Sequence, residues 1–265
     1  MSLVINNKEG RSLNSLEEWK IGFIEVDKKP RHWKEGYSAY SLGYFFTERD
    51  GRPWLDDMLK SVLGEAVQLV SAEIEHPSQL DTYKGGQRMQ DLAIWGKTES
   101  GKTCFIGIEA KVKEPFGDEC IARAFEAAKI EHELKPKSMK ETRIRELISF
   151  LFDGKSPDDE ALQCLRYQLV HYFAGSLFET PSMEQSEEPI SPGRARADIV
   201  VLPVLVFKTQ EYLKHLTEAE MNYQDYLRFI DALNFQVKEI EGRKVYHRRF
   251  GNQKVYTFYE VQSLL

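Results

Sequence analysis

Residues 91–112, DLAIWGKTESGKTCFIGIEAKV, contain two short apolar segments separated by a turn-rich connection. The segments 91–95 and 104–112 are rich in β-branched and aromatic residues, which favour strands. The connection at 96–103 contains two glycines together with lysine and polar residues. Two strands joined by such a short connection predict an antiparallel β-hairpin.

The same connection, 96–103, also matches the Gly-x-x-x-x-Gly-Lys-Thr pattern of a phosphate-binding loop. A true loop of this kind lies between a strand and a helix, and the helix N-terminus holds the phosphates. Here the following residues, 104–112, favour a strand, and no apolar strand ending in aspartate offers a convincing partner. We therefore predict a turn at 96–103 and disfavour a nucleotide hydrolase.

Three charged residues interrupt this hairpin. Alternation along a strand places Glu109 and Lys111 on one face, and Asp91 should pair close to residues 108–110. Charges in an otherwise apolar strand are costly unless they have partners. Two carboxylates supply the hard oxygen ligands that Mg²⁺ prefers, and a nearby lysine can orient water or stabilise developing charge. The pattern therefore predicts a divalent-metal site of the kind that phosphodiester hydrolysis requires.

The rest of the chain favours a mixed order of helices and strands. Helical spacing predicts helices within 30–62, 117–134, 139–152, 158–178 and 217–235. Strands are expected at 67–76 and 198–207, with a closing hairpin formed by 244–250 and 254–261. Loops are expected at 77–88, which contains Gly85 and Gly86, and at 181–197, which is rich in proline, serine and charge.

Composition bears on the partners and the cellular compartment of the protein. The 265 residues carry a net charge of −6, which counts mildly against a sequence-independent nucleic-acid binder. No apolar stretch approaches the roughly 18 residues needed to span a bilayer. Three widely spaced cysteines argue against a disulfide framework, so we expect a cytoplasmic protein with no membrane association. Oligomeric state carries no signal in the sequence.

Two motifs resemble the PD-(D/E)XK nuclease superfamily. Asp91 followed by Glu109-Ala110-Lys111 resembles its signature, although Gln90 stands where the pattern names proline, at a position that varies widely. Residues 168–172, QLVHY, are similar to the Gln-x-x-x-Tyr helix motif of the RecB-like branch. A closer likeness, to an uncharacterised bacterial family of that superfamily, rests on HWKEGYSA, IEAKVKEPFG and LRYQLVHYFAG within residues 32–179.

The resemblance implies an α/β fold with a restriction-endonuclease-like core, in which helices flank a mixed central sheet. We expect a single domain over residues 1–265. It would comprise N-terminal helices at 1–62, the core at 63–208, and a helix plus β-hairpin at 209–265. The expected cofactor is Mg²⁺ or Mn²⁺.

The resemblance also implies roles for individual residues. Asp91 and Glu109 would hold the metal, and Lys111 and Gln168 would complete the catalytic set. A third acidic ligand is common in the superfamily. Glu75 is the favoured candidate for that ligand, with Glu73 on the same face of the 67–76 strand and Glu65 before it as alternatives. The expected substrate-binding residues are Tyr172, Lys113 and Arg166.

The leading functional hypothesis is metal-dependent hydrolysis of DNA. The alternative is a nucleic-acid-binding or structural module that keeps the fold without cleavage. A basic run near the helices at 117–152 either tracks a phosphate backbone or forms a solvated helix face. It comprises Lys129, Lys135, Lys137, Lys140, Arg143 and Arg145. Arg194 and Arg196, in the predicted loop, are candidates to close on a substrate, and His171 is a candidate to approach the site.

Overall fold

The predicted hairpin lies near the middle of the sheet in a computed structural model that describes residues 3–27, 32–83, 87–183 and 194–265. Strand β3 (Arg88–Thr98) pairs antiparallel with β4 (Thr103–Lys111), and Leu92 lies opposite Ile108. The turn is closed by hydrogen bonds from Thr98 N to Lys102 O and from Gly101 N to Thr98 O. Gly101 has a φ of +82°, a conformation that glycine adopts without steric cost. The prediction of a turn at 96–103 is confirmed, and no helix begins there.

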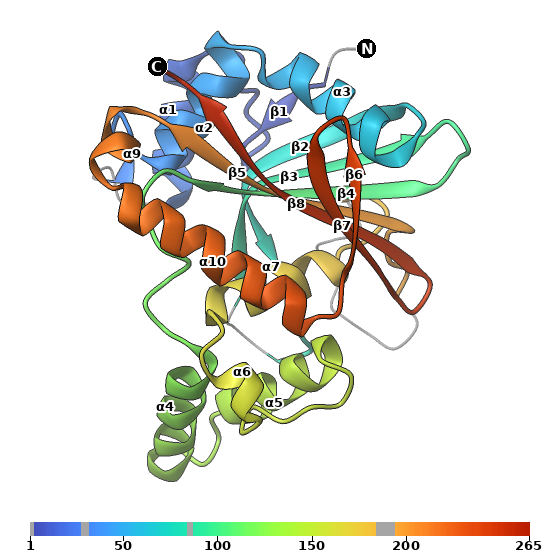
Figure 1. Cartoon of the computed structure of the whole chain (residues 1–265). Helices are drawn as coiled ribbons and strands as arrows, with labels where there is room; N and C mark the ends of the chain where they lie inside the picture. The colour runs from blue at the N-terminus through green and yellow to red at the C-terminus, as the bar shows by residue number, and fades with distance from the viewer. Residues whose placement is uncertain (1–2, 28–31, 84–86, 184–193) are drawn as a thin grey trace.

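Across the described residues the strands form one mixed, eight-stranded sheet in the order β1-β2-β3-β4-β5-β8-β7-β6 (Figure 1). The remaining strands are β1 (Ile5–Asn6), β2 (Val67–Ser78), β5 (Ile199–Lys208), β6 (Gln236–Ile240), β7 (Arg243–Phe250) and β8 (Gln253–Ser263). Strand β5 runs parallel to both β4 and β8, whereas β2 with β3 and β7 with β8 are antiparallel. The expected C-terminal hairpin is therefore not an appendage, because it continues the central sheet and gains β6.

Helices cover both faces of this sheet, and each face has its own hydrophobic core. Alternation along β3 and β4 sends Ile94 and Ile106 to one core and Trp95 and Phe105 to the other. The Ile94 face is covered by α1 (Leu16–Asp27), α2 (Ser38–Glu48) and α3 (Gly51–Leu63). On the Trp95 face, α7 (Tyr167–Leu177) and α10 (Leu216–Ala232) lie next to the sheet. Helices α4 (Ile121–Leu134), α5 (Lys140–Leu151) and α6 (Glu160–Gln163) form a further layer packed on α7, and α9 (Gln210–Lys214) follows β5 (Figure 1).

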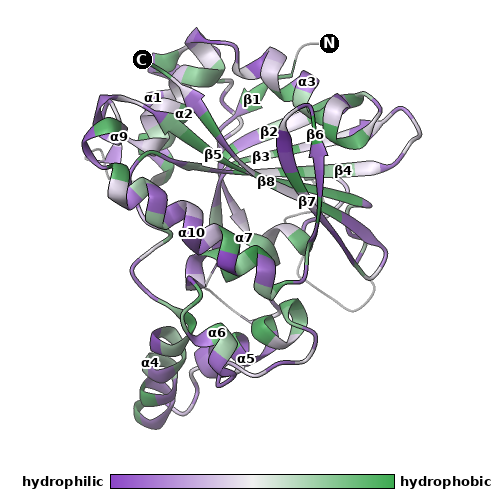
Figure 2. Cartoon of the chain, viewed as in Figure 1, coloured by the Kyte–Doolittle hydropathy of each residue, from purple (hydrophilic) through white to green (hydrophobic). Residues whose placement is uncertain are grey.

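Hydropathy follows this layering. Strand β5 is buried along nearly its whole length, as a continuous apolar run in a parallel environment should be. The edge strand β6 is largely exposed. Figure 2 shows the contrast between hydrophobic β5 and the hydrophilic strands β6 and β7. No helix in the described ranges combines the length and apolar character needed to cross a membrane.

The prediction of one continuous helix at 158–178 is wrong, because the chain forms two helices there, α6 and α7. The backbone at Arg166 is extended and pairs with the segment before α4. Ile121 N donates to Leu165 O at 2.9 Å, and Tyr167 N donates to Glu119 O at 3.0 Å. These bonds satisfy backbone groups that a continuous helix would have used internally, and they set where α7 begins.

The N-terminal region, the cysteines and the predicted loops differ in how closely they follow the sequence patterns. Strand β1 was not expected within the N-terminal helical addition, whereas α1 lies in that addition but before the 30–62 stretch where helical spacing was identified. The three cysteines are free thiols, as their odd number suggested. Gly85 and Gly86 of the predicted 77–88 loop lie outside the described residues, as do residues 184–193 of the loop predicted at 181–197.

Candidate functional site

Three acidic residues occupy matching positions on adjacent strands β2, β3 and β4. Leu92 pairs with both Ile74 and Ile108, so the next residue of β3, Asp91, lies level with Glu75 and Glu109. Antiparallel pairing sends side chains at matching positions to the same face. The site lies on the face that carries the Trp95 core, where helix α7 covers the sheet.

Glu109 is the most heavily contacted of these acids, and its side chain is 1% exposed. Arg88 Nη2 donates to both carboxylate oxygens, at 3.1 and 2.9 Å. Lys111 Nζ lies 2.9 Å from Oε1, and Gln168 Nε2 donates to the same oxygen at 2.7 Å. Two cations and one amide therefore satisfy this buried charge, which would otherwise be very costly.

Asp91 is held differently. Its Oδ2 accepts a hydrogen bond from Ala110 N at 2.7 Å. Burial and repulsion by Glu109 raise the pKa of Asp91 to about 7, although Lys111 and Arg88 oppose the increase. Burial also acts to raise the pKa of Glu109, but Arg88 and Lys111 outweigh it and lower that pKa. The pKa values of these two neighbouring carboxyls therefore shift in opposite directions, as expected when two carboxylates lie close together and repel one another.

Helix α7 supplies Gln168, which points at Glu109 as its place in the motif predicted. Tyr172, one turn later, is fully buried, with its hydroxyl 2.7 Å from Gly107 O and 3.1 Å from Pro203 O. It anchors α7 to β4 and β5. A substrate contact, which the sequence suggested for Tyr172, does not fit a side chain enclosed in this way.

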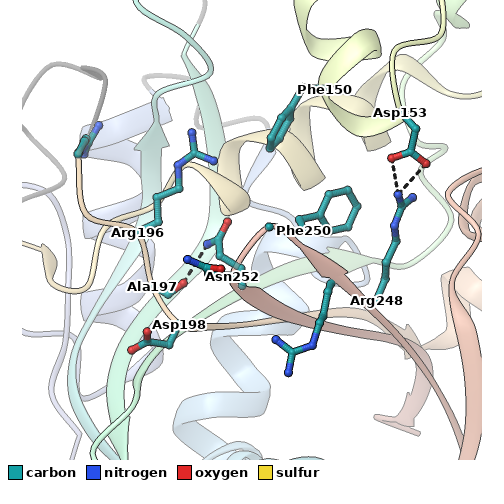
Figure 3. Close-up of a pocket in the computed structure, with 12 residues that line it drawn as sticks. Phe150, Asp153, Arg196, Ala197, Asp198, Arg248, Phe250 and Asn252 are labelled. Atoms are coloured by element: carbon teal, nitrogen blue, oxygen red, sulfur yellow. Dashed lines mark hydrogen bonds and ion pairs between the residues drawn. The ribbon is translucent and has the colours of Figure 1, made fainter.

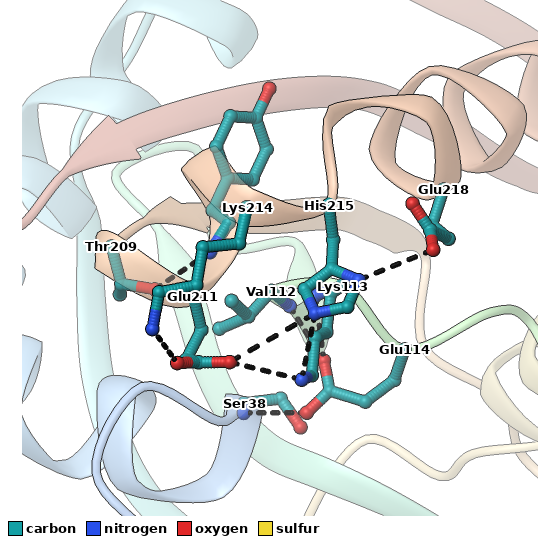
Figure 4. A network of polar contacts seen from close by, with 10 residues as sticks. Ser38, Val112, Lys113, Glu114, Thr209, Glu211, Lys214, His215 and Glu218 are labelled. Carbon is teal, nitrogen blue, oxygen red and sulfur yellow. Dashed lines mark hydrogen bonds and ion pairs between the residues drawn. The ribbon is translucent and has the colours of Figure 1, made fainter.

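The other two predicted substrate-binding residues are held in ion pairs away from Glu109. Lys113 Nζ lies 3.1 Å from Glu211 Oε2 and 3.2 Å from His215 Nε2 (Figure 4). Arg166 Nε donates to Asp225 Oδ2 at 2.6 Å, which ties the start of α7 to α10. Acidic partners from later elements occupy these cations, and the sequence pattern gave no sign of those partners. The structure therefore does not bring Lys113 or Arg166 to the carboxylate pair.

Of the candidates for a third acid, Glu75 alone lies level with Asp91. It has a φ of +49°, a left-handed conformation that a residue with a side chain adopts at a cost. Such strain clusters at functional sites and favours a role for Glu75. Within the described residues, however, no group of three or more His, Cys, Asp or Glu side chains is arranged to hold a metal ion. Glu65 is bound to Ser100 in the hairpin turn.

Glu73 belongs to a separate buried cluster. His76 lies between two acids, with Nδ1 2.9 Å from Glu73 and Nε2 3.2 Å from Glu179. Burial would lower the pKa of His76, but Glu179 and Glu73 outweigh it and raise that pKa to about 9. The histidines are scattered in the sequence, which gave no sign that His76 belongs to a charged cluster. The cluster could not be seen there because Glu179 is 103 residues away from His76 in the chain.

This cluster predicts a pH dependence of stability. Because the folded pKa of His76 lies above its ordinary value of 6.5, its contribution is complete below pH 6.5 and is lost as pH rises through 9. The shift corresponds to about 3 kcal/mol of unfolding free energy. Denaturant titrations at intervals across this range should show stability falling. His76→Gln should flatten the fall, whereas the exposed control His132→Gln should leave it intact; an unchanged slope in His76→Gln would contradict the assignment.

Two further groups of residues take structural positions. His171 packs on Tyr167, with ring centroids 4.2 Å apart, and lines a cavity with Lys140 and Arg143 rather than contacting Glu109. Much of the basic run is paired with acids, which favours a helix face. The pairs are Lys129–Asp158, Lys140–Glu131, Arg143–Asp81 and Arg145–Glu141.

Arg88 is the residue at this site that the sequence did not reveal. It begins β3 and falls out of step with Asp91 in the two-residue alternation, yet its long side chain reaches Glu109. No spacing rule connects an arginine at a strand start with an acid on the next strand. Its position becomes visible once the register of β3 and β4 is known.

The fold and the site together define a mixed α/β protein that holds a carboxylate pair, with two cations and an amide, at one end of a hairpin. A family model described as a domain of unknown function (DUF6946) matches residues 12–260, so the chain belongs to that family. No curated protein and no solved structure matches the chain.

Proposed function

We propose that this protein is a divalent-metal-dependent phosphodiesterase acting on DNA, built on a restriction-endonuclease-like core. One observation carries the proposal. Asp91 and Glu109 lie side by side on a hairpin, and the Lys111 ammonium and the Gln168 amide are both directed at Glu109 Oε1. The order of hairpin, helices and a buried parallel strand supports the same core, as does the resemblance of these motifs to PD-(D/E)XK nucleases.

The donor set fits Mg²⁺ or Mn²⁺, because both cations prefer carboxylate oxygens and complete their shells with water and phosphate. When bound, such a metal neutralises phosphate charge and lowers the pKa of a water ligand. Asp91, Glu109, Glu75, Arg88 and Lys111 carry three negative and two positive charges in their ionised forms, so the cluster keeps an excess of negative charge. That excess favours a cation.

The chain's own groups then have separate tasks. Asp91 and Glu109 supply oxygen ligands, and Gln168 holds the Glu109 carboxylate in position. Lys111, which is 6% exposed, orients the attacking water and offsets charge on the phosphate. Arg88 offers a guanidinium whose fork geometry suits a phosphate once it is released from Glu109.

One observation favours the non-catalytic alternative. Arg88, Lys111 and Gln168 already satisfy the oxygens of Glu109, and such a network can stabilise a fold without any metal. The two candidate functions assign different roles to Arg88. In the phosphodiesterase it competes with the metal for Glu109, whereas in a structural module it is simply an ion-pair partner.

Replacement of Arg88 separates these functions. We expect Arg88→Ala to bind Mn²⁺ several-fold more tightly than the wild type, because one competing cation leaves Glu109. Isothermal titration calorimetry measures this directly. Arg243→Ala is a matched control, since Arg243 also pairs with a glutamate, Glu260, and both arginine side chains are 20% exposed. Unchanged or weaker Mn²⁺ binding in Arg88→Ala would favour the structural module.

The activity itself is tested by a cleavage assay on linear duplex, nicked and single-stranded DNA and on RNA. Each substrate is incubated with Mg²⁺ or Mn²⁺, and parallel reactions contain EDTA. We expect metal-dependent cleavage of at least one DNA substrate. Cleavage that persists in EDTA, or cleavage of RNA alone, would contradict the proposal.

A further inference from the structure

A polar cavity lies at the start of β5, away from the Glu109 site. It has a volume of about 500 Å³, within the range of small-ligand sites. Glu109 pairs with Val204, and Ala197 of the cavity lies seven residues earlier. At about 3.3 Å per residue, the two sites are on the order of 20 Å apart. The cavity is therefore separate from the carboxylate pair.

Arginines dominate the charge of this cavity. Of the described residues, four arginines line it: Arg194, Arg196, Arg248 and Arg249. Two acids of the described chain also line it, and both have hydrogen-bond or ion-pair partners. Asp198 accepts hydrogen bonds from Thr103 N at 2.9 Å and Thr103 Oγ1 at 2.6 Å, whereas Asp153 binds Arg248 at 2.7 and 2.8 Å. Among the described lining residues, four arginines thus outnumber two aspartates, in a protein whose net charge is −6.

Arg196 is the best-placed of these cations to receive a ligand. Its guanidinium carbon lies 4.5 Å from the ring centre of Phe178 and 5.7 Å from that of Phe150. Figure 3 shows Arg196 extending toward Phe150, with Arg248 held by Asp153 elsewhere in the cavity. Among the described residues, Arg196 forms no ion pair with a carboxylate. Stacking fixes the plane of the guanidinium and leaves its edge N–H groups able to donate.

The electrostatics point the same way. Burial and repulsion by Arg194 lower the pKa of Arg196, so two like charges are held near one another, and in the described part of the chain no carboxylate pairs with Arg196. An anion would relieve that repulsion. A planar guanidinium binds phosphate oxygens through paired hydrogen bonds, and Phe150 and Phe250 line the same cavity with aromatic surface.

We propose that this cavity binds the phosphate of a nucleotide, either free or within a nucleic-acid strand, with Arg196 as the principal contact and Phe150 or Phe250 beside the base. The proposal does not depend on cleavage at the Asp91–Glu109 site. It concerns binding alone and requires no metal. If the chain does act on DNA, the same cavity would hold a strand remote from the carboxylates.

The test measures binding by calorimetry in EDTA, so that metal-dependent cleavage cannot contribute. The probes are pyrophosphate, adenosine 5′-monophosphate and a short 5′-phosphorylated single-stranded DNA. Arg196→Gln removes the charge and keeps most of the length. Arg123→Gln is a matched control, because Arg123 is an exposed arginine on α4 outside the cavity. Arg196→Lys keeps the charge but loses the planar fork, and thermal unfolding shows whether each variant is folded.

We expect Arg196→Gln to weaken binding by about tenfold or more, the usual effect of losing a charge-assisted hydrogen bond. Arg196→Lys should lose less, and Arg123→Gln should match the wild type. If Arg196→Gln loses binding of adenosine 5′-monophosphate, the ligand is a free nucleotide. If it loses binding of the DNA probe alone, the ligand is a nucleic-acid strand. Either result supports the proposed binding of a nucleotide phosphate in this cavity. Equal affinities of wild type and Arg196→Gln, no binding by the wild type, or binding of pyrophosphate alone would overturn the proposal.

Discussion

Lys111→Ala should reduce DNA cleavage by on the order of a hundred- to a thousand-fold while Mn²⁺ still binds. The ammonium has no lone pair while protonated, so it is not expected to be a metal ligand. Its proposed task is electrostatic, and removing one group that stabilises transition-state charge commonly costs this much in rate. Cleavage rates under single-turnover conditions, with calorimetry of Mn²⁺ on the same preparations, measure both properties.

The matched control is Lys113→Ala, which removes a lysine two residues later whose ammonium is held by Glu211. We expect this variant to keep a cleavage rate within a few-fold of the wild type. Full activity in Lys111→Ala would refute the site. An equal loss of Mn²⁺ affinity in Lys111→Ala and Asp91→Ala would refute the division of roles between ammonium and carboxylate.

Glu109→Gln should destabilise the fold by about 3 kcal/mol, because it leaves the buried Lys111 and the partly buried Arg88 without their main counter-charge. Breaking a buried ion pair from one side is far more costly than breaking an exposed one. Chemical denaturation of the metal-free protein measures the loss. Glu260→Gln breaks a more exposed pair with Arg243, at 18% and 20% exposure, and should cost less than half as much.

A double-mutant cycle shows whether unpaired charge is the cause. If it is, the combined variant Arg88→Gln with Glu109→Gln should be more stable than the sum of the two single losses predicts. Strictly additive losses would mean that Arg88 and Glu109 do not stabilise one another. The cycle also matters for activity, since a destabilised Glu109 variant can lose cleavage by unfolding rather than by losing a ligand.

Local patterns predicted the centre of this molecule well. The hairpin at 91–112 follows from strand propensity and turn chemistry, and strand alternation correctly placed Glu109 and Lys111 together. The approach of Gln168 followed from a motif rather than from spacing. These features depend on residues that are close in sequence or that belong to one recognisable pattern.

Features that depend on pairing between distant segments could not be predicted in this way. The break between α6 and α7 exists because Leu165 and Tyr167 bond to the segment before α4. The C-terminal strands join the central sheet through parallel pairing of β8 with β5, which leaves no periodic signal. Arg88, Glu179 and the partners of Lys113 likewise become neighbours of their targets only through the fold.

Titration of Mn²⁺ into the wild type and Asp91→Asn most directly tests whether the carboxylate pair is a metal site. Asparagine keeps the shape of the side chain and an oxygen that can accept from Ala110 N, and it removes a charge that is disfavoured by burial and by repulsion from Glu109. The variant should therefore remain folded. We predict one Mn²⁺ per wild-type chain and affinity at least about tenfold weaker in Asp91→Asn, through loss of one charged ligand. No Mn²⁺ binding by the wild type, or equal affinity in the two proteins, would contradict the metal site.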